Sequence, residues 1–569
     1  MYVDVCEYNN EIHAWERDEH GALSHITAPT RDYLYMYVRD NTGHGGFWNM
    51  QNEQMKQLNF KTRKDMRNYA EGRKDVCESD IAPTYRFLME TYTDAVPPTL
   101  NIGMYDIEVD FDLEDGNGYP LPNNPFGEIN AISIYNTQKQ MYAMFIPVQH
   151  RDGIEVIDDR DGIPIELYWC SDERDMLMMF AQYITDIDIL IAWNGDVFDL
   201  PYIMARSINI FGVRYAETMY CRNGIPATSR EYESMYGEML TEWQLKGRTH
   251  LDMMLLFKKF NPGELKSFAL AAVCEEILDE SKIDFEDDLG SLYRENPQRF
   301  YEYSLHDARL LKKLNDKTRI IELAIIFAVM NVVRYSDVTG AVRPIEHGFM
   351  KFCRAKSNIV LPSKKDNERE KFEGAIVYDT IEGRHNMMMT VDLTGLYPYT
   401  MIMLGLSPET FIMQLRGGYE DYIKVTTRTS DTVTVTLVES GDEISLQADE
   451  LDTIIRDNGY VIAGSGAIFN GELGLLAEFV QHGANLRKDY QRQMSEAYKA
   501  GNNEDGARLN GYQGAVKVLN NSIYGATGEP SFRLYDVRLS RAITLTARVI
   551  SKWQAQMANK CVNSLRVGA

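Results

Sequence analysis

The feature that most constrains this chain is an apolar run that ends in a single carboxylate. Residues 387–391 read Met-Met-Met-Thr-Val, which is typical of a buried strand, and Asp392 follows, with a Thr-Gly turn and then Tyr397. A carboxylate at a strand end beside exposed backbone N–H groups suits a metal-bound triphosphate, because the Asp holds the cation and the amides meet phosphate oxygens. The aromatic ring five residues on has the reach to pack under a sugar. The alternative is a core strand that runs into a turn.

A second stretch places polar side chains on one face of a predicted helix. Lys517, Asn521 and Tyr524 are spaced i, i+4 and i+7, whereas Leu519 and Ile523 form another face that suits a core. A cation, an amide and a phenol ring on one stripe can hold phosphate, a minor-groove edge and a base pair. For a helix standing alone, the alternative is an ordinary solvated face.

Together the two stretches resemble the polymerase signatures of family B DNA polymerases. The first resembles the palm pattern Asp-x-x-Ser-Leu-Tyr-Pro, with Gly395 in place of the usual Ser, which leaves the turn looser and removes no ligand. The second resembles the fingers pattern Lys-x-x-x-Asn-Ser-x-Tyr-Gly over residues 517–525. The resemblance implies that Asp392 binds a metal ion and that Leu393 and Thr394 contact an incoming dNTP. Tyr397 would lie under the deoxyribose and exclude a 2′-OH.

The resemblance also implies two long antiparallel fingers helices, over residues 472–500 and 506–524. Arg487 on the first helix and Lys517 on the second are then expected to bind the triphosphate, with Asn521 and Tyr524 contacting the nucleotide and the base pair. These positive charges would offset the charge that develops on the phosphates as the fingers close.

One cation of the fingers pattern is left open. The family's first helix often carries a Lys one turn after the Arg, and here that position is Gln491, with Arg492 beside it. Which cation assists Arg487 is therefore not assigned. Residues 425–437, which follow the first palm motif, are strand-rich and are expected to be structural.

Carboxylates between residues 100 and 316 lie in settings that suggest a second centre. Alternation in a predicted strand puts Asp106 and Glu108 on one face, Asp199 follows an apolar strand over residues 187–193, and Asp307 lies one turn after Tyr303 in a helix-like run. Taken singly, each has an ordinary explanation, because a strand pair is usually solvated and Asp199 could cap a helix. Asp252 lies nearby in sequence and matches no ligand motif.

As a set, these residues resemble the three exonuclease motifs of proofreading polymerases: Asp-x-Glu, Asn-x(2–3)-Phe-Asp and Tyr-x-x-x-Asp. Three residues separate Asn194 from Phe198, which is within the family's range. The resemblance implies a 3′→5′ exonuclease in which Tyr303 orients the attacking water. Two divalent ions about 3.5–4 Å apart need several carboxylates to hold them. Mg²⁺ is the expected metal, with Mn²⁺ as the alternative, and the implied ligands are Asp106, Glu108, Asp199 and Asp307.

The resemblance implies an α+β multidomain fold. It comprises an RNase H-like 3′→5′ exonuclease domain with a mixed α/β sheet, an incomplete polymerase palm of antiparallel sheet with helices, and two-helix antiparallel fingers. We expect an N-terminal domain over residues 1–99 (completed by about 317–365), the exonuclease domain over 100–316, the first part of the palm over 366–467, the fingers over 468–527, and a palm continuation over 528–569.

Charge and cysteine content fit this interpretation. The net charge of −25 argues against a protein that coats nucleic acid nonspecifically, whereas residues 471–569 hold 13 Lys and Arg against 8 Asp and Glu, as expected where a backbone is gripped. The 7 cysteines form no C-x-x-C pair, which fits a reducing cytoplasm. The start is not a signal peptide and no apolar run reaches membrane-spanning length. We expect a cytoplasmic protein, in the host bacterium if it is encoded by a phage.

The sequence that follows the predicted fingers lacks the second palm carboxylate. Family B polymerases carry it in a Tyr-Gly-Asp-Thr-Asp hairpin after the fingers, and Asp392 alone cannot fix the Mg²⁺ that bridges attacker and triphosphate. Between residues 526 and 569 the acidic residues are Glu529 and Asp536, and neither belongs to an Asp-x-Asp pattern. We therefore expect the N-terminal polypeptide of a naturally split polymerase of the large tailed-bacteriophage type. The start at Met1 and an untagged tail favour this over an artificial or degenerate fragment.

Several partners and one alternative function follow from the resemblance. The expected partners are primer–template DNA, dNTP, a second polypeptide that brings the remaining palm Asp residues and the thumb, and replisome proteins such as a sliding clamp and a single-strand-binding protein, with no membrane. The isolated chain is predicted to be inactive as a polymerase. The alternative is a free-standing exonuclease that uses a degenerate palm and fingers as a DNA-docking platform, and a non-catalytic scaffold is a third interpretation.

Overall fold

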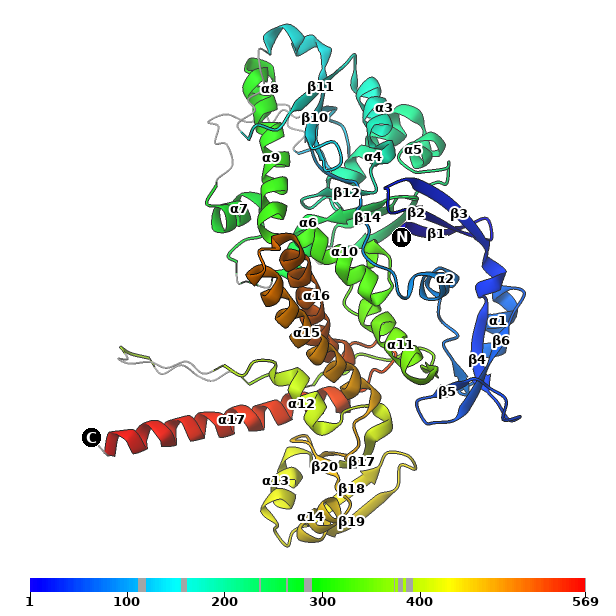
Figure 1. The fold of residues 1–569 in the computed structure, drawn as a ribbon, viewed down its shortest axis with the longest axis vertical. Helices are drawn as coiled ribbons and strands as arrows, with labels where there is room; N and C mark the ends of the chain where they lie inside the picture. Colours follow the sequence, from blue (N-terminus) through cyan, green and yellow to red (C-terminus); the bar gives the residue numbers. More distant parts are fainter. Residues whose placement is uncertain are drawn as a thin grey trace. The chain divides into compact units, whose positions relative to one another are not determined.

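The computed structural model describes residues 1–110, 119–154, 161–234, 237–261, 263, 265–280, 289–372, 374–376, 382–384 and 392–567. The chain forms two compact units, each built from two stretches of sequence (Figure 1). Unit 1 consists of Met1–Tyr33 and Ala82–Thr339, and unit 2 of Leu34–Ile81 and Gly340–Ala569. The predicted exonuclease residues therefore fall in unit 1 and the predicted polymerase residues in unit 2. The finer domain boundaries stay predictions.

A 6-stranded mixed sheet forms the centre of unit 1, in the order β11-β10-β9-β8-β12-β15. Strands β8, β9 and β10 are antiparallel neighbours, whereas β12 runs parallel to β8 and β15 parallel to β12. All residues of β9, β12 and β15 are buried, which requires cover on both faces. The strands are β8 (Ile102–Val109), β9 (Ile129–Asn136), β10 (Met141–Pro147), β11 (Ile165–Cys170), β12 (Ile189–Ala192) and β15 (Thr249–Asp252).

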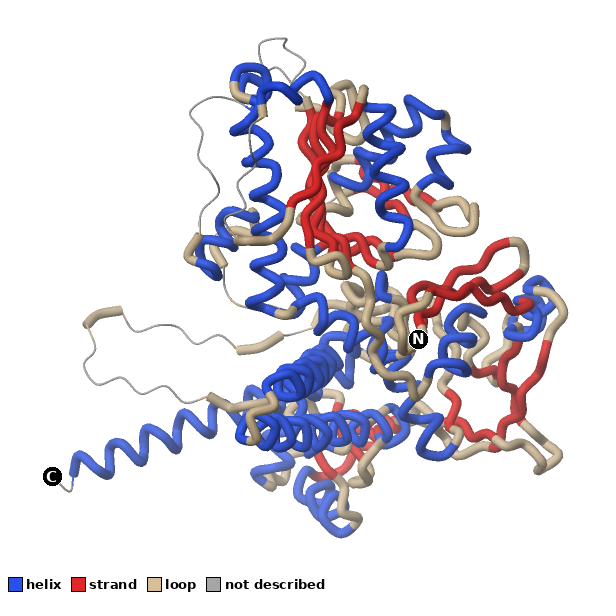
Figure 2. The backbone as a smooth tube through the Cα atoms, turned by 45° about the horizontal axis from the view of Figure 1, so that its top comes forward, coloured by secondary structure: helices blue, strands red, loops and turns tan. Residues whose placement is uncertain are grey.

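Helices supply that cover, and Figure 2 shows them on both sides of the sheet. Helix α9 (Pro297–Thr318) packs on β8 and β9, and α3 (Glu173–Tyr183) packs on β10 and β11. The side chain of Asn296 caps α9 and Pro297 occupies its first turn, which fixes where the helix begins. The other helices are α2 (Pro83–Tyr92), α4 (Asp199–Phe211), α5 (Val213–Met219), α6 (Met253–Phe260), α7 (Leu270–Leu278), α8 (Leu289–Glu295) and α10 (Ile320–Asn331).

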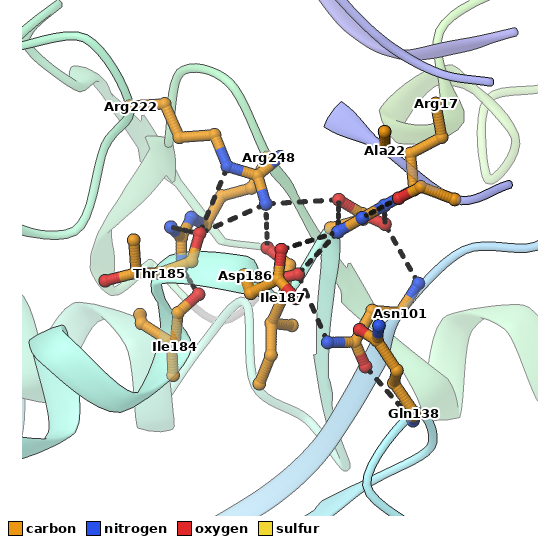
Figure 3. A network of polar contacts seen from close by, with 12 residues as sticks. Arg17, Ala22, Asn101, Gln138, Ile184, Thr185, Asp186, Ile187, Arg222 and Arg248 are labelled. Atoms are coloured by element: carbon orange, nitrogen blue, oxygen red, sulfur yellow. Dashed lines mark hydrogen bonds and ion pairs between the residues drawn. The ribbon is translucent and has the colours of Figure 1, made fainter. Parts of the chain in front are cut away.

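A buried ion-pair network fixes the start of β12 (Figure 3). Asp188, whose side chain is fully buried, accepts hydrogen bonds from Arg17 Nε (2.5 Å), Arg222 Nη2 (3.1 Å) and the Asn101 backbone N–H (2.9 Å). Two guanidinium groups and an amide thus compensate the desolvation of a fully buried carboxylate. Arg17 ends β2 of an antiparallel sheet formed by β1 (Tyr2–Tyr8), β2 (Glu11–Arg17) and β3 (Leu23–Pro29), so this sheet is tied to the strand that leads into Asn194.

Unit 1 also carries a β-hairpin. Strands β13 (Thr228–Glu233) and β14 (Met239–Gln244) pair antiparallel, from Thr228 opposite Gln244 to Glu233 opposite Met239. Residues 235 and 236 lie outside the described part.

Unit 2 contains two 5-stranded sheets. The first has the order β16-β5-β6-β4-β7 and is assembled from strands far apart in sequence, because β16 pairs parallel with β5. Its elements are β4 (Tyr35–Arg39), β5 (Phe47–Asn49), β6 (Gln54–Asn59), α1 (Arg63–Ala70), β7 (Val76–Cys77), α11 (Arg343–Ser357) and β16 (Ile359–Val360). Residues 34–81 therefore associate with the C-terminal half of the chain.

The second sheet has the order β19-β18-β17-β21-β20, and all its strand pairs are antiparallel. The strand-rich segment 425–437 contains β18, but it begins in a helix, because Val425 lies in α13 (Tyr419–Thr427). Its side chain is fully buried in the core with Val433 and Leu451, so packing overrides β-branched propensity. The elements are β17 (Phe411–Leu415), β18 (Thr432–Leu437), β19 (Glu443–Gln447), α14 (Ala448–Asp457), β20 (Val461–Ile462) and β21 (Ala467–Phe469).

Two 25-residue helices, α15 (Leu475–Lys499) and α16 (Asn503–Thr527), pack along one another. This is the predicted helical pair, with bounds shifted by a few residues. A Cβ on Gly483 would lie 2.3 Å from Asn520 Oδ1, so glycine allows the close approach of the helices. Unit 2 is completed by α12 (Leu396–Leu404) and α17 (Val537–Val567).

Candidate functional site

Three carboxylates that the sequence singles out come together in unit 1. Ligand oxygens of Asp106, Glu108 and Asp307 all lie within 4.8 Å of one another. Alternation along β8 puts Asp106 and Glu108 on one face, and α9 lies across that face and contributes Asp307. Among the described residues, this is the one group of three or more such ligands at metal-binding distances. Its donors are all hard carboxylate oxygens, which fits Mg²⁺.

Asp199 lies beside this cluster and is held there by the backbone. It opens α4, is 4% exposed, and accepts a hydrogen bond at 3.3 Å from the N–H of Ile107, the residue between Asp106 and Glu108. Burial raises the pKa of Asp199 to about 7, and His250 acts in the opposite direction. A cation bound at the neighbouring cluster would favour the ionised form of Asp199 and so oppose this shift.

Tyr303 lies on the same helix as Asp307, one turn before it. Both residues belong to the buried face of α9, and Tyr303 is 7% exposed. Helical spacing of four residues puts their side chains on one side of α9. Tyr303 therefore lies on the side of α9 that carries Asp307 of the carboxylate cluster, as its predicted role requires.

Sequence reasoning missed a second polar cluster next to Asp199. His250 Nδ1 lies 2.7 Å from Asp196 Oδ1, and His250 Nε2 lies 3.0 Å from the hydroxyl of Tyr105. Burial and the neighbouring Asp196 raise the pKa of Asp252 to about 6. Asp252 Oδ1 accepts from the backbone of Asn194 (3.1 Å), which ties β15 to the loop that carries Asp199. The available signal was the alternation in residues 249–252, which puts His250 and Asp252 on one face.

The palm motif of unit 2 is only partly described. Residues 385–391, which carry the predicted strand, lie outside the described part, whereas Asp392 and Thr394 are exposed and Leu393 is half-buried. Gly395 has φ +71°, a left-handed conformation that favours glycine, and α12 begins directly after it. The Thr-Gly turn is therefore present.

The two motifs of unit 2 meet through their tyrosines. The rings of Tyr397 and Tyr524 stack at 4.5 Å between centroids with an interplanar angle of 24°. Tyr397 lies in the first turn of α12, and Tyr524 lies near the end of α16. Two aromatic residues that the sequence assigned to the sugar and the base pair thus lie side by side.

The faces of α16 are those that the sequence predicts. Lys517 and Asn521 are exposed, whereas Leu519 is 7% exposed and Ile523 is fully buried. On α15, Arg487 is half-buried and its Nε donates to Gln513 Oε1 of α16 at 3.2 Å.

The neighbours of Arg487 on α15 differ in their contacts. Gln491 Nε2 lies 3.4 Å from the same Gln513 oxygen, and Arg492 pairs with Glu496 at 3.3 Å. Gln491 thus shares with Arg487 the acceptor oxygen of Gln513, whereas Arg492 forms an ion pair within α15. Which cation assists Arg487 stays open.

No helix in the described part of the chain is both long enough and apolar enough to cross a bilayer.

Comparisons with known proteins extend over most of the chain. Residues 50–273 match the family described as DNA polymerase family B, exonuclease domain, and residues 338–567 match DNA polymerase family B. Asp106, Glu108 and Asp199 lie in the first range and the unit 2 candidates in the second, while Tyr303 and Asp307 lie between the two.

Individual relatives agree with this. The DNA-directed DNA polymerase of Escherichia phage RB69 is 25% identical over 534 residues, covering 84% of this chain and 57% of that protein. That of Enterobacteria phage T4 is 24% identical over 512 residues, covering 81% and 55%. The DNA polymerase delta catalytic subunit of Plasmodium falciparum is 28% identical over 459 residues, covering 76% and 37%. The chain thus spans somewhat more than half the length of the phage relatives.

A solved structure shares the fold. The family B DNA polymerase from the archaeon Pyrobaculum calidifontis superposes with a TM-score of 0.69 at 17% identity, covering 98% of this chain and 71% of that one. The two family matches lie in the order exonuclease domain and then polymerase. The first contains Asp106, Glu108 and Asp199, and the second contains the paired helices. The chain therefore belongs to DNA polymerase family B, with an exonuclease domain followed by polymerase-domain sequence.

Proposed function

We propose that this chain is the N-terminal part of a DNA-directed DNA polymerase for viral genome replication. It carries a 3′→5′ proofreading exonuclease and half of the nucleotidyl-transfer site, and a second polypeptide completes that site. The observation that carries the proposal is the cluster of Asp106, Glu108 and Asp307, because a strand and a distant helix assemble it as the family's motifs require.

In the proposed exonuclease, side chains of this chain hold the divalent ions and orient the attacking water. Asp106, Glu108, Asp199 and Asp307 would hold divalent ions, which when bound supply an activated water and stabilise the leaving 3′ oxygen. The Tyr303 hydroxyl orients the attacking water from the same helix as Asp307. The substrate is the 3′ end of single-stranded or frayed DNA.

In the polymerase half, Asp392 is the metal ligand. The backbone of Leu393 and Thr394 meets the triphosphate, and Tyr397 supports the deoxyribose. Its stack with Tyr524 fixes the ring in place, which supports a role in selecting deoxynucleotides.

The fingers residues complete the nucleotide site of this half. Lys517 and Asn521 point to solvent from α16, where a nucleotide can reach them, and Arg487 contributes from α15. Placing cations where charge develops on the phosphates lowers the barrier, since such groups need not reorganise during the reaction.

A second carboxylate must come from elsewhere, because a two-metal site needs more than one. Among the described residues, Asp392 belongs to no group of three or more acidic, His or Cys ligands at metal-binding distances. The two acidic residues between 526 and 569 are already engaged, since Glu529 pairs with Arg369 (2.5 Å) and Asp536 with Arg538 (2.7 Å). Helix α17 also exposes Trp553 (61%), an apolar surface on which the remaining palm could pack. Primer–template DNA, dNTP, a sliding clamp and a single-strand-binding protein are the other proposed partners.

The test is a pair of assays on the purified chain. With Mg²⁺ it should degrade single-stranded DNA from the 3′ end and incorporate no dNTP, and adding the second polypeptide should restore primer extension. Asp307→Ala should abolish the nuclease, whereas Asp316→Ala, at an exposed position on the same helix, should not. Extension by the pure chain alone would refute the half-site, and an active Asp307→Ala protein would refute the nuclease assignment.

A further inference from the structure

Unit 2 contains a cationic groove. None of the residues proposed above for the nuclease or polymerase site lines this groove. Its volume is about 770 Å³, and it lies between α17, β17 and the turn into α13. The lining cations are Arg416, Arg538, Arg541, Arg548 and Lys552, and Glu420 is the carboxylate that faces them. Such a concentration of positive charge is unusual in a chain of net charge −25 and marks a local anion-binding surface.

Some of this charge is neutralised within the protein and some is not. Arg538 pairs with Asp536 at 2.7 Å, and Arg416 pairs with Glu443 at 3.1 Å. In the described part of the chain, no carboxylate lies within ion-pair distance of Arg541 or Lys552, which are both exposed. The groove therefore keeps a positive excess toward solvent.

The cations are held in place by neighbouring groups. Arg538 lies 4.7 Å from the ring centroid of Phe411. Arg541 Nη2 donates to the carbonyl of Lys371 at 3.4 Å, and Arg548 Nε donates to the carbonyl of Gly374 at 2.9 Å. Ordered side chains lose less conformational entropy when a ligand binds, so the groove is prepared for an anion.

The spacing of the cations favours a strand over a single nucleotide. Arg538, Arg541, Arg548 and Lys552 follow one side of α17 at intervals of three, seven and four residues. From Arg538 to Lys552 the helix rises about 21 Å, at about 1.5 Å per residue. Successive phosphates of a nucleic acid can meet all of these cations, whereas one triphosphate meets only neighbouring ones.

An exposed aromatic ring lies beside the cations. Tyr419 lines the groove and is 39% exposed. Lys552 Nζ lies 5.7 Å from its ring centroid, and the ring of Tyr422 stacks with it at 6.0 Å and 22°. An aromatic platform next to a basic track is the combination by which proteins bind single strands without sequence preference.

We propose that this groove binds single-stranded nucleic acid, with phosphates along α17 and a base on Tyr419. This site goes beyond the proposed function, because it takes part in neither metal-dependent reaction. It would hold a strand while the two centres act on other DNA.

Metal-free binding tests the groove separately from both activities. The full chain in EDTA is titrated with a short fluorescein-labelled oligothymidylate at several NaCl concentrations, and anisotropy gives the affinity. Arg541→Gln with Lys552→Gln should make the slope of log K against log[NaCl] less negative by about 1.4, at about 0.7 for each lost phosphate contact. At 0.1 M salt the same loss is a roughly 25-fold weaker affinity. Lys499→Gln with Lys560→Gln, an equal loss of charge outside the groove, is the matched control.

Two further measurements guard the conclusion. Arg541→Lys with Lys552→Arg keeps both charges and should restore the wild-type slope, which excludes misfolding as the cause. A 4-thiothymidine oligonucleotide should cross-link to the peptide that contains Tyr419. A glutamine double variant with the same slope of log K against log[NaCl] as its control would overturn the proposal. Displacement of the cross-link by dTTP as efficiently as by an unlabelled oligothymidylate would also overturn it. Neither outcome depends on whether the nuclease or the polymerase half is active.

Discussion

Replacing Asp252 by Asn should remove a pH-dependent loss of stability from unit 1. The Asp252 side chain is buried, and its Oδ1 accepts from the N–H groups of Asn194, Met254 and Leu255. Burial, with Asp196 as a further cause, raises its pKa from 3.8 to about 6. An Asn side chain keeps the oxygen that accepts these hydrogen bonds and carries an NH2 group in place of the protonated oxygen. The variant therefore resembles the neutral acid at every pH.

The sign follows from where the proton is bound. Because the folded pKa is raised, folding takes up a proton at this site, and the associated stability is present below about pH 4 and is lost as the pH rises through about 6. A shift of about two pKa units corresponds to about 3 kcal/mol. The free energy of unfolding of the Asn variant should therefore exceed that of the wild type by about 3 kcal/mol more at pH 7 than at pH 4.

The assay is urea unfolding in EDTA, followed by tryptophan fluorescence across this pH range. Asp172→Asn is the matched control, since Asp172 also caps a helix but at an exposed position, and it reports what the substitution alone does to a cap. A difference between the Asn variant and the wild type that stays flat from pH 4 to pH 7 would show that Asp252 is not a proton-binding group of the folded state.

Three further predictions concern the network, the helical pair and the metal site. Asp188→Asn leaves the buried Arg222 without a carboxylate and Arg17 with only the exposed Asp186, so it should cost about 3–5 kcal/mol in urea unfolding, against less than about 1 kcal/mol for Asp186→Asn. Gly483→Ala forces a Cβ against Asn520 and should cost about 1–3 kcal/mol, whereas Gly525→Ala, on a free face of α16, should stabilise by about 0.5–1 kcal/mol. Mg²⁺ at about 100 times its Kd should stabilise the wild type by about 2.7 kcal/mol in a thermal-shift assay, and Asp307→Asn should lose this response. Equal responses within any of these pairs would contradict the corresponding assignment.

Local periodicity accounts for what could be predicted about individual faces. A period of two along β8 is enough to put Asp106 and Glu108 on one side, and a period of 3.6 along α16 separates Lys517 from the buried Ile523. These patterns concern neighbours in the sequence, so no knowledge of the rest of the fold is needed. The motifs then fixed the order of the centres along the chain.

Other parts of the site depend on burial between distant segments. His250, Asp196 and Tyr105 belong to no shared motif, and the parallel pairing of β12 with both β8 and β15 brings them together. Val425 would favour a strand by its own propensity, but a helix buries it better against Val433. Such outcomes are set by packing, which a local pattern does not contain.

By itself, the sequence pointed to the family, to the carboxylates of unit 1 and to the faces of α16 on which Lys517 and Ile523 lie. Only the tertiary structure decided that α9 brings Asp307 within 4.8 Å of β8, that residues 34–81 join the C-terminal unit, and that α17 and β17 enclose a basic groove. The physical reason is range: propensity and periodicity act over a few residues, whereas the burial of apolar surface and the pairing of buried charges act between segments that are neighbours only in space.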